Sequence, residues 1–336
     1  LIGTIESRVG GEARPAVRTT PEAIDLQRTF REMLDAGDRS CVMEATSHGS
    51  ELGRLDRVRF KALAFTNLTQ DHLDFHGSMD RYYEAKRRLF AEAEPAPAAA
   101  VNIGDEWGRR LAEELRRLDR APLLTYGLTP DADIHEHTFA TRLRGRFNVE
   151  NVLAAVAVSQ LLGVPDEAMQ EGIERLPGVP GRFESIDEGQ SFAVIVDYAH
   201  TPDSLENVLR TARDLSGARV ICVFGCGGDR DRGKRPQMGR VAGELADVPI
   251  VTSDNPRSED PLAIIEEILA GVGKDVDVEP DRRAAIEKAI GLANPDDVVV
   301  IAGKGHEQGQ EFADRKVPFD DREVAREALQ RLGAPA

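Results

Sequence analysis

VICVFGCGGDRDR, residues 220–232, is a run of five apolar, strand-favouring residues that ends in a glycine-rich polar turn. The second half of the chain repeats this plan four times, and helical patterns follow most of the turns. Such alternation is typical of βαβ units in a parallel sheet. We therefore predict an α/β fold in which four polar loops share one sheet edge, as in doubly wound, Rossmann-like domains. The other strands and turns are 192–196 into 197–203, 249–252 into 253–257, and 298–302 into 303–307.

Two similar apolar runs occur in the first half, at residues 40–43 and 62–66. The first ends at Glu44, and the second is followed by a segment that contains His72. Because ligands bind beyond the carboxyl ends of parallel strands, this carboxylate and imidazole can converge on a metal ion or a phosphate. Helices are expected at 79–93 and 147–162.

A proline- and glycine-rich segment, Leu176–Gly181, interrupts both periodicities before a new strand begins. Such segments favour a domain boundary, and 336 residues is about twice the usual domain size. We predict two domains, residues 1–178 and 181–336.

The composition excludes several classes of protein. A net charge of −16 argues against a nucleic-acid partner, and no apolar run reaches the ~20 residues that span a bilayer. Three cysteines are too few for a disulfide framework, so free thiols and a cytoplasmic location are expected. The Asp-rich segments 275–281 and 314–321 are interpreted as solvated loops.

Lys86 follows Glu44 and His72 and is an unusual neighbour for a metal site, because an ammonium cannot bind a cation. It can contact phosphate directly, or it can react with carbon dioxide to give a carbamate, which suits Mg²⁺. Structural alternatives stay open: His72 as a loop histidine and Lys86 as a solvated helix lysine.

Two loops of the second half carry arginines. The glycines at 225–228 do not match the dinucleotide fingerprint, but with the charged residues 229–235 they suit recognition of a carboxylate or phosphate. The alternative is a solvated basic loop. Asp254-Asn255-Pro256-Arg257 joins a stiff turn to an arginine that can clamp a carboxylate, or it is a structural Asn-Pro turn. A Ser-His-Asp nucleophile elbow is absent from the sequence.

Taken together, ordered motifs along nearly the whole chain closely resemble the Mur ligase family, in the branch that adds the third residue of the peptidoglycan stem peptide. The motifs are Thr19-Thr20, the segment 43–49, FTNLTQDHLDFHGSMDRYYEAK from Phe65, FNVENVLAA from Phe147, GRFE from Gly181, VDYAHTPDSLE from Val196, FGCGGDRDRGKRPQMG from Phe224, DNPR from Asp254 and AGKGHE from Ala302.

The resemblance implies roles for individual residues. Glu44 and His72 would bind Mg²⁺, and Lys86, carbamylated by carbon dioxide, would help to hold the second metal ion. The UDP-muramoyl dipeptide would be contacted by Thr19, Thr20, Ser47 and Arg54. ATP would be contacted by Asn148, Arg182, Asp197 and His200. Diaminopimelate would be held by Arg230, Asp254, Asn255, Pro256, Arg257, Gly303 and Glu307.

The implied activity is an ATP-dependent ligation of meso-2,6-diaminopimelate to UDP-N-acetylmuramoyl-L-alanyl-D-glutamate through an acyl phosphate. The implied fold is a central P-loop-type, ATPase-like parallel-sheet domain followed by the Rossmann-like domain. The family members that use L-lysine usually lack the arginine of DNPR, so Arg257 points to diaminopimelate. A monomer that acts on small molecules is expected.

The sequence departs from the family pattern at its start. It contains no G-x-x-x-x-G-K-[ST] phosphate loop, and no uridine-binding domain precedes Leu1. We interpret this as an N-terminally truncated record and expect the 336 residues alone to be inactive. The alternatives are a lysine-adding homologue, a folylpolyglutamate synthase, and a binding module without catalytic activity.

Overall fold

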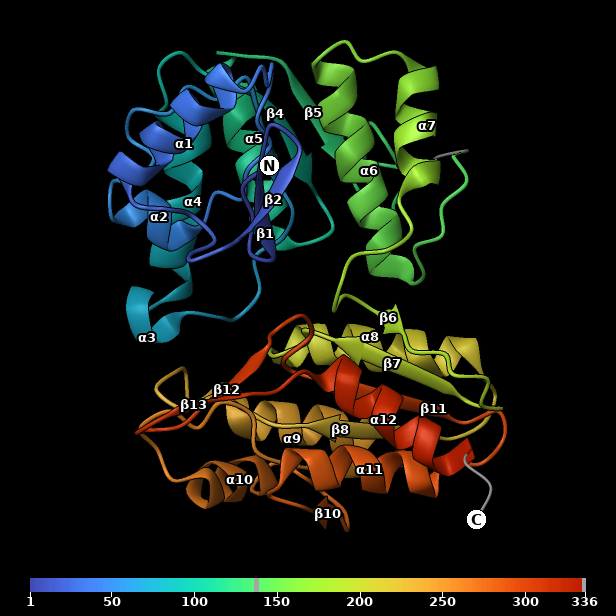
Figure 1. The fold of residues 1–336 in the computed structure, drawn as a ribbon. Helices are drawn as coiled ribbons and strands as arrows, with labels where there is room; N and C mark the ends of the chain where they lie inside the picture. Colours follow the sequence, from blue (N-terminus) through green and yellow to red (C-terminus); the bar gives the residue numbers. More distant parts are fainter. Residues whose placement is uncertain (136–138, 334–336) are drawn as a thin grey trace. The chain divides into compact units, whose positions relative to one another are not determined.

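The computed structural model describes residues 1–135 and 139–333, which form two compact units (Figure 1). The first unit contains Leu1–Leu68, His76–Phe139 and Glu150–Ile173, and the second contains Thr69–Phe75, Ala140–Val149 and Glu174–Ala336. The domain limits at 178 and 181 stay a prediction.

The second unit contains a six-stranded sheet in which every neighbouring pair is parallel except the last. All four strands that the sequence predicted in this half belong to it. The spatial order is β10 (Asp277–Val278), β9 (Val248–Val251), β8 (Val220–Phe224), β11 (Val298–Ala302), β7 (Ala193–Asp197) and β6 (Glu184–Ser185).

The central strands β8 and β11 are buried at every residue, which explains their continuous apolar sequences. Strands of a parallel sheet are covered on both faces, so neither face needs polar side chains. Successive residues still alternate between two cores: Val298 and Val300 belong to one hydrophobic cluster, and Val299 and Ile301 to another.

Helices cover both faces of this sheet (Figure 1). The first cluster contains residues of α8 (Pro202–Leu215), α9 (Lys234–Leu245) and α10 (Pro261–Leu269), and the second contains residues of α11 (Arg282–Leu292) and α12 (Asp321–Gly333). The predicted α/β class with parallel sheets is therefore confirmed.

Local signals determine where these helices begin. Thr201 and Ser204 form a reciprocal capping box at the start of α8, and Pro202 occupies the first turn, where its missing N–H costs nothing. Asp260 and Asp281 cap α10 and α11 by accepting hydrogen bonds from the backbone N–H groups of Leu262 and Ala284. Each cap thus marks the end of a polar loop.

The first unit contains a smaller parallel sheet and an antiparallel hairpin. The prediction of a strand at residues 40–43 is wrong. Only Met43 of this segment makes a β-bridge, because Ile2 is the single residue that pairs with it. The strands are β1 (Glu6–Val9), β2 (Glu12–Pro15), β3 (Ala62–Phe65), β4 (Ala98–Asn102) and β5 (Leu123–Tyr126). The helices are α1 (Ala23–Asp35), α2 (Ser47–Glu51), α4 (Met79–Ala91), α5 (Glu106–Leu118) and α7 (Asp166–Arg175).

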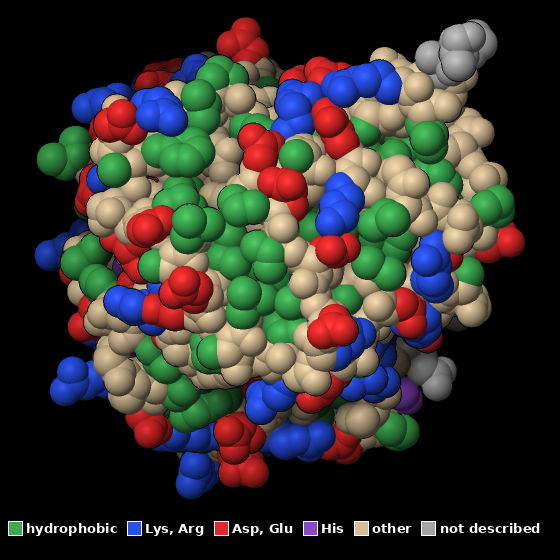
Figure 2. Space-filling model, turned by 90° about the horizontal axis from the view of Figure 1, so that it is seen from below, with side chains coloured by type: hydrophobic (Ala, Val, Ile, Leu, Met, Phe, Trp, Pro, Cys, Tyr) green, Lys and Arg blue, Asp and Glu red, His purple; other side chains and the backbone are tan. Residues whose placement is uncertain are grey.

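Three helices, α3 (Leu73–His76), α6 (Arg146–Leu161) and α7, have residues in both units, and α7 lies mostly in the first. A final hairpin of the second unit consists of β12 (Gly309–Glu311) and β13 (Lys316–Pro318). Acidic and basic side chains are interspersed on the face that Figure 2 shows. Within the described ranges, no helix is long and apolar enough to cross a membrane.

Candidate functional site

The carboxyl ends of β8, β9 and β11 lie next to one another in the second unit, because these strands are parallel. The chain runs from β8 outward to β9 and β10, and then returns to β11 on the other side of β8. Loops that leave such a point in opposite directions form the usual ligand site of an open α/β sheet. The loops after β9 and β11 carry most of the residues predicted to bind diaminopimelate.

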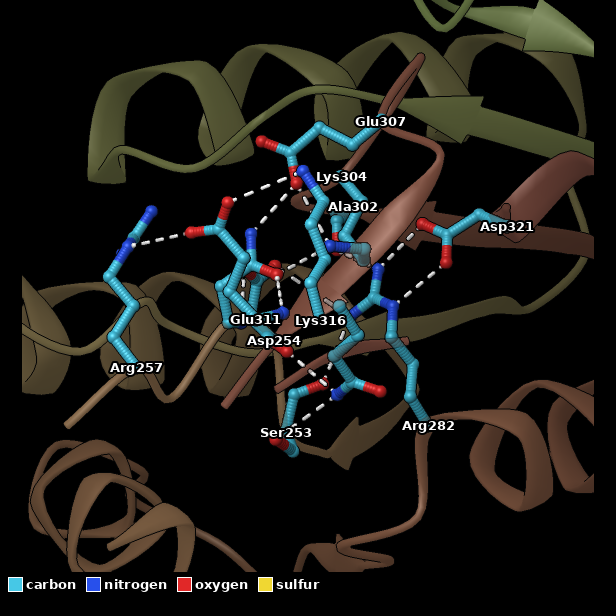
Figure 3. Close-up of polar contacts among 12 residues, drawn as sticks. Ser253, Asp254, Arg257, Arg282, Ala302, Lys304, Glu307, Glu311, Lys316 and Asp321 are labelled. Carbon is cyan, nitrogen blue, oxygen red and sulfur yellow. Dashed lines mark hydrogen bonds and ion pairs between the residues drawn. The ribbon is translucent and has the colours of Figure 1, made fainter. Parts of the chain in front are cut away.

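A buried lysine joins these two loops. Lys304 is fully buried, and its Nζ atom donates hydrogen bonds to Asn255 Oδ1 at 2.8 Å and to Glu307 Oε2 at 2.9 Å (Figure 3). Asn255 Nδ2 donates to the same Glu307 oxygen at 2.8 Å. The backbone N–H of Glu311 donates to Asn255 Oδ1 at 3.0 Å. The three side chains therefore form a closed triangle of hydrogen bonds.

Asp254, the neighbour of Asn255, presents a buried carboxylate at this sheet edge. Burial works to raise its pKa, but the positive charges of Lys304 and Arg282 hold the pKa below its usual range. Within the described residues its Oδ2 atom has no hydrogen-bond partner, and Arg282 Nη1 lies 3.9 Å away. At Gly303, where φ is +120°, a Cβ atom would lie 2.5 Å from Oδ2, so the loop requires glycine there.

Arg282 and Asp321 lie next to this edge of the sheet (Figure 3). The guanidinium also donates to the carbonyl of Ala302 at 2.9 Å, which anchors the end of β11. The interpretation of 314–321 as solvated is therefore wrong at its end, where Asp320 and Asp321 are buried and form ion pairs with Arg322 and Arg282.

Arg257 has a positive φ of +50°. It links its own loop, after β9, to the glycine-rich loop after β8 and to strand β12. Its Nη1 donates to the carbonyl of Gly228 at 2.7 Å, and its Nε lies 3.3 Å from Glu311 Oε2. The backbone N–H of Arg257 also donates to the carbonyl of Glu311. The guanidinium predicted to bind a substrate carboxylate is thus already oriented by the glycine-rich loop and by β12.

The loop after β8 is fixed by ion pairs, so the alternative of a solvated basic loop is wrong for Lys234 and Arg235, which are buried. Arg235 donates to both oxygens of Glu259, and Glu259 also accepts from the backbone N–H of Asp229 at 2.6 Å. Arg230 is exposed and donates to the carbonyl of Asp229 at 2.8 Å. This arrangement leaves Arg230 accessible to an anion.

Three of the predicted ATP contacts, Arg182, Asp197 and His200, gather at the end of β7. Asp197 accepts hydrogen bonds from the backbone N–H groups of Phe183 at 2.6 Å and Ala199 at 2.7 Å, and its own carbonyl accepts from Gly303. Burial raises the pKa of the Asp197 carboxyl. The Arg182 guanidinium lies 4.3 Å from the centre of the Tyr198 ring, which makes a cation–π contact.

His200 and His72 share one carboxylate within the second unit. Their Nε2 atoms each lie 3.5 Å from Asp71 Oδ2. Although burial opposes the effect, the hydrogen bond to His200 and the charge of Lys234 hold the pKa of Asp71 well below its usual range. Asn148 is buried, and its Nδ2 atom donates to the carbonyl of Arg144 at 2.7 Å.

The predicted metal and dipeptide residues of the first unit range from the buried Thr20 and Ser47 to the exposed Glu44. Glu44 accepts hydrogen bonds at each carboxylate oxygen, from the N–H and the hydroxyl of Thr4, both at 2.7 Å. Thr19 contacts the Thr4 hydroxyl at 3.1 Å. Thr20 is buried and donates to the carbonyl of Glu44 at 2.8 Å, so it positions Glu44 directly.

A line of contacts leads from Ser47 to Lys86. Ser47 is buried, and its Oγ atom lies 3.0 Å from His76 Nε2. The His76 ring stacks on Tyr82 at 4.9 Å, and the Lys86 Nζ atom lies 5.4 Å from the centre of the Tyr82 ring. Arg54 lies in the same unit and forms an ion pair with Glu22 at 2.9 Å.

The available donor groups fit a magnesium ion. A carboxylate has about four lone-pair sites, so Glu44 retains acceptor capacity beyond the two hydrogen bonds from Thr4. Glu44 and Lys86 belong to the first unit and His72 to the second, so their convergence stays a prediction. Within residues 1–135 and 139–333, no three His, Cys, Asp or Glu side chains form a metal-binding group by themselves.

A hollow of about 370 Å³ lies in the first unit, beside Thr19 and Thr20. Its lining combines apolar residues with three charged ones, Arg18, Glu22 and Asp25. It is formed by Ile2, Gly3, Ser7, Pro15, Ala16, Val17, Arg18, Pro21, Glu22, Asp25 and Thr29.

Sequence reasoning missed Lys304, Arg282, Asp321 and Glu311. Lys304 alone had a signal, since it lies within the quoted AGKGHE motif. Arg282 and Asp321 are 39 residues apart, and nothing in their local sequences indicates that they pair.

Comparison with known proteins shows the family of this chain. The Mur ligase middle domain matches residues 1–159, and the Mur ligase, glutamate ligase domain matches residues 181–305. A protein of Solibacter usitatus described as UDP-N-acetylmuramoyl-L-alanyl-D-glutamate–2,6-diaminopimelate ligase is 48% identical over 358 residues, covering 99% of this chain and 72% of its own. The chain belongs to the Mur ligase family.

Solved structures give the same result. The structure of a ligase with that same description has a TM-score of 0.62 at 34% identity, and the match covers 96% of this chain and 71% of the other. The folylpolyglutamate synthase of Mycobacterium tuberculosis has a TM-score of 0.58 at 20% identity, covering 82% and 64% of the two chains. The second likeness shows a shared fold alone.

Proposed function

We propose that this protein is an ATP-dependent amide ligase that joins meso-2,6-diaminopimelate to UDP-N-acetylmuramoyl-L-alanyl-D-glutamate in peptidoglycan precursor synthesis. The observation that carries the proposal is the grouping of Arg257, Asn255 and Glu307 on adjoining loops of the second unit. The names of the relatives that match nearly the whole chain support it.

The charges at this edge suit an amino acid with two zwitterionic ends. Arg257 and Arg230 offer guanidiniums that can hold carboxylates in a fixed fork. Glu307 and the orphaned Oδ2 atom of Asp254 offer negative charge for an ammonium. L-Lysine lacks the distal carboxylate, so it would leave one arginine without its partner.

The proposed reaction proceeds in two steps. The γ-carboxylate of D-glutamate attacks the γ-phosphorus of ATP, which gives an acyl phosphate and ADP. The amine of diaminopimelate then attacks the acyl carbon, loses a proton and expels phosphate. Binding and orientation of the reactants supply most of the catalysis in this kind of transfer.

Magnesium ions would neutralise phosphate charge when bound. Glu44, His72 and a carbamate on Lys86 would hold them, and the acceptor capacity of Glu44 supports this assignment. Asn148, Arg182, Asp197 and His200 would contact ATP, and the gathering of the last three at the end of β7 supports their role. The residues proposed to contact the UDP-muramoyl dipeptide are Thr19, Thr20, Ser47 and Arg54. The hollow of the first unit supports the roles of Thr19 and Thr20, which follow its lining residue Arg18 in the sequence, and of Arg54, which pairs with its lining residue Glu22.

The finer description of the fold is also part of the proposal. The strand order of the second unit supports a Rossmann-like domain over 181–336, and the parallel β3–β4–β5 sheet supports a P-loop-type, ATPase-like domain over 1–178. A cytoplasmic location and action as a monomer on small molecules are also part of the proposal.

The test is ATP-dependent phosphate release by the full-length protein expressed from its gene, with UDP-N-acetylmuramoyl-L-alanyl-D-glutamate and either meso-diaminopimelate or L-lysine. Release with diaminopimelate alone supports the proposal. Preference for lysine would reject the role of Arg257, and no release with either would favour a folylpolyglutamate synthase or a binding module.

A further inference from the structure

Lys304 is more deeply buried than the charged and amide side chains assigned to the amino-acid substrate so far. Its side chain is fully buried, whereas the side chain of Glu307 is 30% exposed. A buried ammonium is costly unless charged or polar groups surround it. Here the compensating groups are Asn255 and Glu307, both of which are proposed to contact diaminopimelate.

The hydrogen bonds of Lys304 determine how each of these two side chains is oriented. The Asn255 amide oxygen accepts from Lys304 Nζ and from the backbone N–H of Glu311, so the amide nitrogen must point toward Glu307. Glu307 Oε2 accepts from both Lys304 and Asn255. Within the described part of the chain, the other oxygen, Oε1, accepts no hydrogen bond.

We infer that Lys304 is a positioning residue for the amino-acid substrate: its ammonium fixes Asn255 and Glu307 so that Glu307 Oε1 is left for the ammonium of the substrate. This inference rests on the proposed function. The charge of Lys304, together with that of Arg282, also helps to keep the pKa of Asp254 low.

The experiment uses the full-length protein and three variants, Lys304→Met, Glu307→Gln and the double variant. Phosphate release is measured while the concentrations of diaminopimelate, ATP and UDP-muramoyl dipeptide are varied in turn. Lys304→Met is expected to raise the KM for diaminopimelate about tenfold or more, because a charge-assisted hydrogen bond is lost. The KM values for the other two substrates should change less than about twofold, since remote sites act independently.

The double variant tests whether Lys304 acts by positioning Glu307 or by stabilising the site in general. If Lys304 acts through Glu307, the KM for diaminopimelate of the double variant should equal that of Glu307→Gln within about threefold. The effects of substitutions at coupled residues do not add. Lys288→Met is the matched control, since that lysine is 40% exposed and pairs with exposed Asp277 at 2.9 Å. It should leave every kinetic constant unchanged.

Contrary results are equally clear. The inference would be overturned if the effects of the two substitutions on the KM for diaminopimelate multiplied in the double variant, or if Lys304→Met raised all three KM values equally. The ligase function would stand in either case. If Lys304→Met does not fold, Lys304→Gln replaces it, and failure of both to fold would make the role purely structural and overturn the inference. A wild-type protein that releases no phosphate with diaminopimelate would overturn the proposed function as well.

Discussion

Arg282 and Asp321 form a bidentate ion pair in which both side chains are fully buried. Nε donates to Oδ1 at 2.8 Å and Nη2 donates to Oδ2 at 2.7 Å. Burial alone would lower the pKa of the guanidinium, but the carboxylate of Asp321 raises it beyond its ordinary value. The pair connects α11 with α12 beneath the end of β11.

Replacing Arg282 by Met should therefore lower the free energy of unfolding by about 3 to 5 kcal/mol, because Asp321 would remain buried without its partner. Urea unfolding followed by circular dichroism measures this change. Arg283→Met is the control, since Arg283 and Glu327 form an exposed pair whose loss should cost less than about 1 kcal/mol. Equal losses in the two variants would contradict the argument.

Arg257→Lys tests specificity at the proposed diaminopimelate site. A lysine cannot form a bidentate fork, so kcat/KM with diaminopimelate should fall roughly 100-fold, while any residual rate with L-lysine should change little. Steady-state phosphate release gives both values. Arg315→Lys, at an exposed arginine paired with Asp314, should have no effect. An equal loss with both amino acids would show that Arg257 only supports the loop.

The loss of folding stability at low pH should arise in part from Glu259. The hydrogen bond from Arg235 lowers the pKa of Glu259 to about 2, from an ordinary value of 4.5. A carboxyl with a lowered folded-state pKa contributes stability above its ordinary pKa and loses it as the pH falls.

The free energy of unfolding should therefore decline between about pH 5 and pH 2, and Glu259→Gln should reduce that decline by on the order of 1 to 3 kcal/mol. Urea titrations at a series of pH values measure the slope. A variant whose slope equals that of the wild type would exclude Glu259 as a source of the pH dependence.

Two helical glycines should respond in opposite directions to alanine. A Cβ atom on Gly239 in α9 would lie 2.1 Å from the carbonyl oxygen of Ile268, whereas one on Gly291 in α11 meets nothing within 4 Å. Gly239→Ala should lower the free energy of unfolding by roughly 1 to 3 kcal/mol, and Gly291→Ala should raise it by roughly 0.5 to 1 kcal/mol. Urea unfolding of both variants tests the pair, and stabilisation by Gly239→Ala would contradict the close packing of α9 on α10.

The strands of the second half could be predicted because β7, β8, β9 and β11 are apolar and continuous, a pattern that only full burial explains. The segment 40–43 has a similar pattern but no such partner strands, and the pattern alone does not show what pairs with it. The class of the fold therefore followed from the sequence, whereas this element did not.

Charged residues of the site were harder to predict. Arg257 and Glu307 have local motifs, but the burial of Lys304 and Asp321 depends on partners from distant elements. An Asp-rich segment normally favours solvent, and only the arginine on α11 makes burial of Asp321 favourable. The site residues proposed from the family resemblance await the kinetic tests above.

Asp197 links three backbone segments of the second unit by hydrogen bonds. Its side chain holds the backbone of Phe183 and Ala199, and its carbonyl holds the backbone of Gly303. The segment that enters the unit, the turn after β7 and the loop after β11 therefore cannot shift separately without breaking one of these bonds. A displacement that begins at any one of the three is shared by the others, so the ends of the sheet edge that we propose to bind ATP and the amino acid should move together.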